Sequence, residues 1–244
     1  MANFFPRWTN LLPVKIVLCL GVLGAGMVVG FTYYATPKAL RVGYQPSQPI
    51  PYSHDLHVRQ LGMDCRYCHS YVEYSAHANV PAASVCWKCH SQVAKGSPAL
   101  AGLRAAMGVD EDHQPLEGEA AKGLPIEWVR VHKSPDYVYF NHSAHLNRGI
   151  SCRSCHGKVN EMVVVRQAES HAMGFCLDCH RNPEAHLRPL EEVFNLDYEA
   201  EEYLAGNEVY DTGGKRITTQ EEFGKFLKEH WSIAPRESCA ACHR

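Results

Sequence analysis

Ten of the eleven cysteines in this chain of 244 residues form pairs in which two residues separate the thiols, and a histidine directly follows every pair. The five copies are CRYCH (Cys65, Cys68, His69), CWKCH (Cys86, Cys89, His90), CRSCH (Cys152, Cys155, His156), CLDCH (Cys176, Cys179, His180) and CAACH (Cys239, Cys242, His243). Such a group has two chemical uses. Cysteine pairs hold zinc, and the CxxCH pattern attaches a haem by two thioether bonds with the histidine reaching the iron.

The spacing between pairs gives zinc some support. Seventeen residues separate Cys68 from Cys86 and twenty separate Cys155 from Cys176, close to the spacing of zinc ribbons. Zinc would leave the fifth pair without a partner, however, and would give the five adjacent histidines no role. Haem attachment uses all of them. The pattern therefore predicts five covalently bound haems c, with the five motif histidines as proximal ligands.

The elements that position these motifs include an internal repeat. YSHDLHVRQLGMDCRYCHSYV at 52–72 aligns with FNHSAHLNRGISCRSCHGKV at 140–159 after deletion of one residue. Each copy has HxxH, then CxxCH, then a second CxxCH further on. The repeat predicts two-haem modules at 52–95 and 138–186, and a fifth haem at 236–244.

Electron-transfer haems are usually closed on both faces, so five irons require five further ligands. The HxxH pairs supply four candidates, His54, His57, His142 and His145. Imidazoles three residues apart can point toward two different haems. For the fifth distal ligand, Met173 is the first choice, and the alternatives are His132, Met162 and His171; the competing interpretation of Met173 is an ordinary packing side chain.

The predicted fold class is a mainly α and irregular domain built around five haems, preceded by one transmembrane helix. Porphyrins are large apolar discs that supply core volume, so the chain needs little regular structure. Residues 96–127 are predicted to be a surface loop or partner contact. In 187–236, an acidic run precedes a predicted helix at 219–231, where Thr219 and Glu222 form a capping box.

Residues 16–34, IVLCLGVLGAGMVVGFTYY, carry no charge. As a helix they would span about 29 Å, close to the roughly 30 Å of a bilayer core. We predict a single-pass anchor at 16–34, with residues 1–15 in the cytoplasm, a linker at 35–51 and the haem domain at 52–244. A cleaved secretory signal is the alternative, but YYATP is a poor cleavage site. The formal charge of −2 gives no indication of nucleic-acid binding.

Three segments carry a resemblance to a known family: WVRVHKSPDYVYFNHSAH at 128–145, MGFCLDCHRNPEAHLRP at 173–189, and WSIAPRESCAACHR at the C-terminus. They resemble the membrane-anchored pentahaem cytochrome c subunit of alternative complex III, a bacterial quinol oxidoreductase, and the resemblance extends over most of 50–244. It implies a class III cytochrome c-like haem arrangement. It also implies an iron-sulfur subunit and integral-membrane quinol-binding subunits as partners.

In that family the pentahaem subunit relays electrons from quinol oxidation to a monohaem cytochrome c or another periplasmic acceptor, and is not an enzyme by itself. Haem attachment outside the cytoplasm implies the inner membrane of a bacterium, with the N-terminus in the cytoplasm and the haem domain outside. A NapC-type quinol dehydrogenase is the alternative, but there the first motif lies close behind the anchor, whereas Cys65 lies 31 residues beyond Tyr34. A multihaem reductase would need an open iron.

Overall fold

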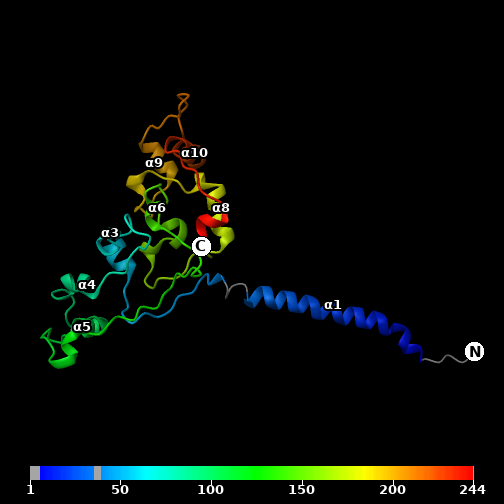
Figure 1. Ribbon diagram of the computed structural model, residues 1–244, viewed down its shortest axis with the longest axis horizontal. Coiled ribbons are helices and arrows are strands. Elements are labelled where there is room, and N and C mark those ends of the chain that lie inside the picture. The colour runs from blue at the N-terminus through cyan, green and yellow to red at the C-terminus, as the bar shows by residue number, and fades with distance from the viewer. Residues whose placement is uncertain (1–5, 36–39, 244) are drawn as a thin grey trace, which may run out of the picture. The chain divides into compact units, whose positions relative to one another are not determined.

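The computed structural model describes residues 6–35 and 40–243, and the chain divides into an N-terminal unit up to Val42 and a second unit from Gly43 onward (Figure 1). Regular structure in the described ranges is helical, and β pairing there is limited to isolated bridges. The mainly α and irregular character predicted from the sequence is therefore confirmed. The boundaries of the two-haem modules at 52–95 and 138–186 stay a prediction.

The N-terminal unit is one long apolar helical segment. A 3-10 turn at Arg7–Leu11 leads into α1, Leu12–Gly30, and a π-helical turn follows at Phe31–Ala35. The helix begins four residues before the predicted residue 16. Pro13 lies in its first turn, where proline is favoured, and the long aliphatic stem of Lys15 is compatible with an apolar helix. Trp8–Tyr34 is long and apolar enough to cross a membrane, a property that anchors and signal sequences share.

Each of the five CxxCH motifs lies on a short helix of the second unit or extends one residue beyond its end. These helices are α3 (Cys65–Cys68), α4 (Ala83–His90), α7 (Arg153–His156), α8 (Met173–Arg181) and α11 (Cys239–Cys242). Residues three apart lie on the same face of a helix, so one helical turn presents both thiols of a motif together. Asp64 caps α3 by accepting a hydrogen bond from the backbone of Arg66 at 2.8 Å.

The two HxxH segments form one helical turn each, in different ways. His54 caps a π-helical segment at Asp55–Gln60 that contains His57. His142 and His145 lie on α6, His142–Leu146, whose N-cap Asn141 accepts a hydrogen bond from the backbone of Ala144. In both cases the paired histidines are one turn apart.

Residues 96–127 are more ordered than the surface loop predicted for them. They contain a 3-10 turn at Pro98–Leu100, helix α5 at Ala101–Met107 and a second 3-10 turn at Gly118–Lys122. Leu100, Leu103 and Met107 recur at helical spacing, so one face packs against Ile50 and Trp87. The helix ends at Gly108, whose φ of +67° is the left-handed conformation that favours glycine.

The part of the chain that follows α7 has its own core. It contains 3-10 turns at Val159–Glu161, Pro183–Ala185 and Leu190–Glu192, and helices α9 (Ala200–Gly206) and α10 (Gln220–His230). Its buried cluster consists of Leu187, Leu204, Ile217, Phe223 and Leu227. The helix predicted at 219–231 is confirmed as α10. It begins after Thr219 because the Thr219 side chain accepts a hydrogen bond from the backbone of Glu222 at 3.3 Å.

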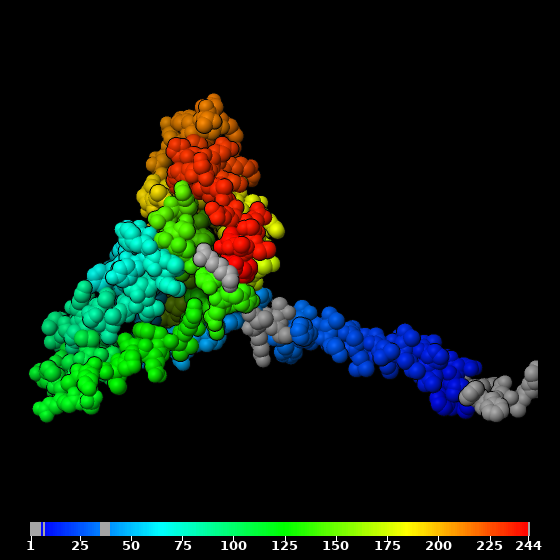
Figure 2. Space-filling model, viewed as in Figure 1, coloured from blue at the N-terminus to red at the C-terminus, as the bar shows by residue number. Residues whose placement is uncertain are grey.

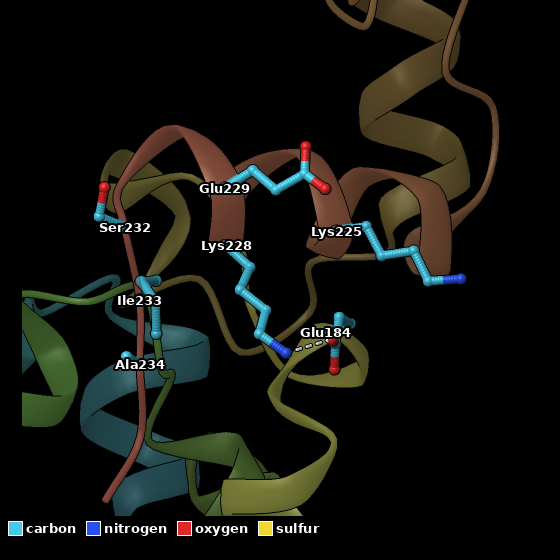
Figure 3. A pocket seen from close by; sticks show the side chains of 7 residues that line it. All are labelled: Glu184, Lys225, Lys228, Glu229, Ser232, Ile233 and Ala234. Atoms are coloured by element: carbon cyan, nitrogen blue, oxygen red, sulfur yellow. Dashed lines mark hydrogen bonds and ion pairs between the residues drawn. The ribbon is translucent and has the colours of Figure 1, made fainter.

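Helix α10 lies directly on the turn that follows α8. The ammonium of Lys228 contacts the carboxylate of Glu184 at 2.6 Å, as Figure 3 shows. In the space-filling view the C-terminal segment, coloured red, lies against the green segment near residue 140 (Figure 2). A hydrogen bond of 2.8 Å from the backbone of Tyr139 to the carbonyl of Cys242 joins them.

Candidate haem-binding site

Six of the predicted axial histidines have Nδ1 on a backbone carbonyl. The contacts are His57 with Ser53 (2.8 Å), His69 with Asn79 (2.6 Å), His90 with Val93 (3.1 Å), His142 with Ala76 (2.7 Å), His145 with Asn141 (2.7 Å) and His180 with Arg236 (2.8 Å). A carbonyl oxygen only accepts, so Nδ1 must donate the proton. In a neutral ring this leaves the lone pair on Nε2 available to a metal.

Predicted distal and proximal rings also lie opposite one another. The ring centroids of His57 and His90 are 6.1 Å apart, and those of His145 and His180 are 6.2 Å apart. Two nitrogen–metal bonds of about 2 Å, with about 1 Å from each nitrogen to its ring centre, give about 6 Å between centroids. Both separations match the space that an iron between two imidazoles requires.

A third pair belongs to the third motif. His142 and His156 have centroids 6.4 Å apart and nearly parallel planes, at 10°. His132, the alternative candidate, lies only 4.3 Å from His156, which is too close for a metal between the rings. Nε2 of His171 is within 3.0 Å of the carbonyl of Cys155 and so is already engaged. The geometry favours His142 over both.

One aromatic ring holds each HxxH pair in place. The ring of Tyr52 meets His54 edge-on (4.9 Å, 89°) and stacks on His57 (4.5 Å, 24°). Phe140 does the same in the second copy, edge-on to His142 (4.8 Å, 88°) and stacked on His145 (4.4 Å, 26°). Neither residue belongs to the CxxCH or HxxH motifs. The aligned YSH and FNH, each with an aromatic two residues before the first histidine, were the available signal.

Burial keeps four of the candidate ligands neutral, which is the form that binds iron. Burial and the nearby His69 lower the pKa of His54 to about 4. Burial and the nearby His132 lower the pKa of His156 to about 3. The pKa values of His142 and His145 are also lowered, mainly by burial.

None of the ten motif cysteines forms a disulfide, and each is half-buried or exposed: Cys65, Cys68, Cys86, Cys89, Cys152, Cys155, Cys176, Cys179, Cys239 and Cys242. Burial raises the pKa of Cys152 to about 11 and that of Cys155 to about 12. Across the described residues, 6–35 and 40–243, no three His, Cys, Asp or Glu side chains converge as a metal site requires. The paired spacing on helical turns fits thioether attachment.

The remaining candidates are placed as follows. Met173 begins α8, one turn before Cys176, and its side chain is exposed. Met162 is buried in the core. The ring of Tyr137 lies 5.7 Å from that of His243 in the fifth motif. The choice of Met173 as the fifth distal ligand stays a prediction.

Helical turns with paired thiols and imidazoles at this separation fit the multihaem cytochrome c domain that the sequence predicts. Residues 138–244 match the family model described as cytochrome c7 and related cytochrome c. The chain is also 34% identical over 134 residues to the multiheme cytochrome c subunit of menaquinone reductase from Nitratidesulfovibrio vulgaris (strain Hildenborough). That match covers 54% of this chain and 56% of the relative, so the chain matches about half of the relative's length.

Proposed function

We propose that this chain is an electron-transfer subunit, which holds five covalently bound haems c and relays electrons between a quinone-reactive membrane complex and a periplasmic acceptor. The observation that carries the proposal is the opposition of His57 to His90 and of His145 to His180. Closing both faces of an iron suits electron transfer and leaves no position for a substrate. The chain therefore does not act as an enzyme by itself.

The residues divide into three roles in this proposal. The paired motif cysteines tether the porphyrins, and His69, His90, His156, His180 and His243 bind the irons from one face. When bound, each haem stores one electron by reduction of its iron. The distal ligands bind on the other face. His57 is the distal ligand for the second motif, His142 for the third and His145 for the fourth. His54 serves the first motif, and Met173 serves the fifth.

The surrounding protein fixes the ligands before any electron moves. Backbone carbonyls hold Nδ1 of the histidines, and Tyr52 and Phe140 hold the rings of the HxxH segments. An imidazole that is already oriented needs little rearrangement when the charge on the metal changes. This favours rapid electron exchange.

The complex that we propose is alternative complex III or a close equivalent. Its integral-membrane quinol-binding subunits and an iron-sulfur subunit would supply the electrons, and a monohaem cytochrome c would accept them. The similarity to a menaquinone reductase subunit supports quinone-reactive partners and favours a second direction, toward menaquinone reduction. Purifying the complex in mild detergent, then comparing quinol:cytochrome c activity with cytochrome:menaquinone activity, distinguishes the two directions.

The helix around α1 is proposed to be a retained single-pass anchor, with the N-terminus in the cytoplasm and the haem domain on the periplasmic side. Its support is the apolar stretch Trp8–Tyr34. A full-length protein that is extracted from membranes only by detergent, with its N-terminus intact in mass spectrometry, is the expected result. A mature protein that begins beyond residue 34 and is soluble would identify a signal sequence instead.

Carbon monoxide tests the relay function. It binds ferrous haem only where a coordination position is open, so the reduced full-length protein should show no change in its spectrum. Stoichiometric binding to one haem would identify an open iron, and the reductase interpretation would then replace the relay.

A further inference from the structure

The proposed function leaves open which haem exchanges electrons with which. The five motifs do not follow one another in space as they do in the sequence. Contacts between the segments that carry them establish which motifs are neighbours. We call the motifs 1 to 5 in sequence order, from CRYCH to CAACH.

Motifs 1 and 2 are direct neighbours. The ammonium of Lys88, inside motif 2, lies 6.0 Å from the ring of Tyr67, inside motif 1. The first HxxH segment directly precedes motif 1 in the chain and also reaches motif 2, because His57 lies opposite His90.

On the side away from motif 2, motif 1 contacts motif 3. The segment that follows motif 1 docks on the start of α6, where the backbone N–H and Nδ1 of His142 both bond the carbonyl of Ala76, at 3.2 and 2.7 Å. Asn147 donates to the carbonyl of Glu73 at 3.0 Å. Behind this contact Val72 belongs to a buried cluster on which Cys152 of motif 3 packs.

Helix α6 then joins motif 3 to motif 4. His142 lies opposite His156 in motif 3, and His145, one turn further, lies opposite His180 in motif 4. A second link runs through His171, whose Nε2 bonds the carbonyl of Cys155 while its ring lies 5.9 Å from that of Phe175 in α8.

Motif 5 attaches to motif 4. Nδ1 of His180 bonds the carbonyl of Arg236, and the guanidinium of Arg181 contacts the carboxylate of Glu237 at 3.2 Å. Both contacts hold the residues directly before α11. The far side of motif 5 lies on residues 138 and 139, through the bridge between Val138 and His243.

The further packing on motif 2 comes from a cluster that contains no other CxxCH motif. Cys86 and Trp87 pack against the cluster of Ile50, Leu100 and Leu103, which belongs to the linker and the α5 segment. Motif 2 therefore ends the series on one side, and motif 5 ends it on the other.

We propose, resting on the function above, that the five haems form one line in the spatial order 2–1–3–4–5, with CWKCH and CAACH at its two ends. Each step moves one electron from a ferrous to a neighbouring ferric iron, oxidising the first and reducing the second, and needs no further reactant. Partners exchange electrons at motif 2 and motif 5. The segment that contains α5 lies beside the first of these ends.

A structure of the haem-loaded full-length protein tests the order directly, because each iron is assigned by its thioether cysteines. The shortest iron–iron separations are expected for pairs 2–1, 1–3, 3–4 and 4–5. An iron of motif 3 closer to motif 2 than to motif 1, or motif 5 in the interior, would overturn the proposal. Fewer than five haems would count against the proposed function, whereas five haems in another order would count against this inference alone.

Spectroelectrochemistry of two matched variants gives a solution test. A thioether ligand raises the reduction potential of a haem, so the altered haem is reduced first. The electron that it takes up then shifts the midpoint potentials of the neighbouring haems. In His57→Met the altered haem is at an end, and one other midpoint potential should shift. In His142→Met it lies in the middle, and two should shift. Equal numbers of shifted potentials in the two variants, each with five haems per chain, would contradict a line with motif 2 at its end.

Discussion

The imidazole of His145 faces that of His180 at 6.2 Å between ring centroids, and Nδ1 of each ring is held by a backbone carbonyl. The two histidines come from different helices, α6 and α8. The fold therefore builds a complete axial pair from a repeat segment and a motif that are separate in the sequence. The same relationship recurs between His57 and His90.

Replacing His145 should open one iron. In His145→Ala we expect one haem per chain to become high-spin and to bind carbon monoxide once reduced, because no imidazole remains opposite His180. His230→Ala is the matched control, since that ring stacks on Phe226 in α10. Electron paramagnetic resonance and optical titration measure the change. A His145→Ala protein that stays fully low-spin would show that another residue is the ligand.

The ring of Tyr52 should set the orientation of two ligands. Tyr52→Ala removes the contacts to His54 and His57, each worth about 1 kcal/mol. We expect broadened low-spin resonance signals for two haems. Tyr52→Phe should leave the signals unchanged, because Phe140 performs the same task in the second copy. Identical spectra for Tyr52→Ala and the unaltered protein would rule out this positioning role.

The Glu184–Lys228 contact should make stability depend on pH. The hydrogen bond from Lys228 lowers the pKa of Glu184 below its usual 4.5. Because the folded-state pKa is the lower one, the stabilisation is fully present above pH 4.5 and is lost as the pH falls through the folded value. The carboxylate is partly solvated, so Glu184→Gln should cost no more than about 1 kcal/mol at pH 7.

Urea unfolding at pH 7 and pH 3 measures that effect. The difference in the free energy of unfolding between Glu184→Gln and the unaltered protein should be smaller at pH 3 than at pH 7. Lys215→Gln, which removes the more exposed contact to Glu222, serves as the control for an ordinary surface pair. A Glu184→Gln effect of the same size at both pH values would show that charge is not the cause.

Gly224 is required for the close approach of α10 to the turn at Pro183–Ala185. A Cβ at this position would lie 1.9 Å from the carbonyl oxygen of Glu184, so Gly224→Ala should cost about 3 kcal/mol. Gly206→Ala in α9 is the control, because a Cβ there meets nothing within 4 Å. Thermal unfolding followed by circular dichroism compares the two. Equal midpoints would contradict the tight packing.

The sequence predicted what depends on local pattern. The CxxCH motifs, the HxxH segments, the apolar helix and the capped helix that begins after Thr219 are all readable within a few residues. Which rings face each other is different, because the pairing of His57 with His90 depends on how distant segments fold together. Helix α5 is not predicted from the sequence, because its apolar stripe of Leu100, Leu103 and Met107 is too short to distinguish a helix from a loop. The stripe is recognisable only from its packing against Ile50.

The proposed electron relay depends most on covalent attachment of five haems. The pyridine haemochromogen spectrum of the full-length protein, after acid-acetone extraction of non-covalent haem and with the protein quantified independently, measures it directly. Five haems c per chain, retained after extraction, are expected. A protein that loses its haem on extraction, or that carries zinc in its place, would contradict the proposed relay.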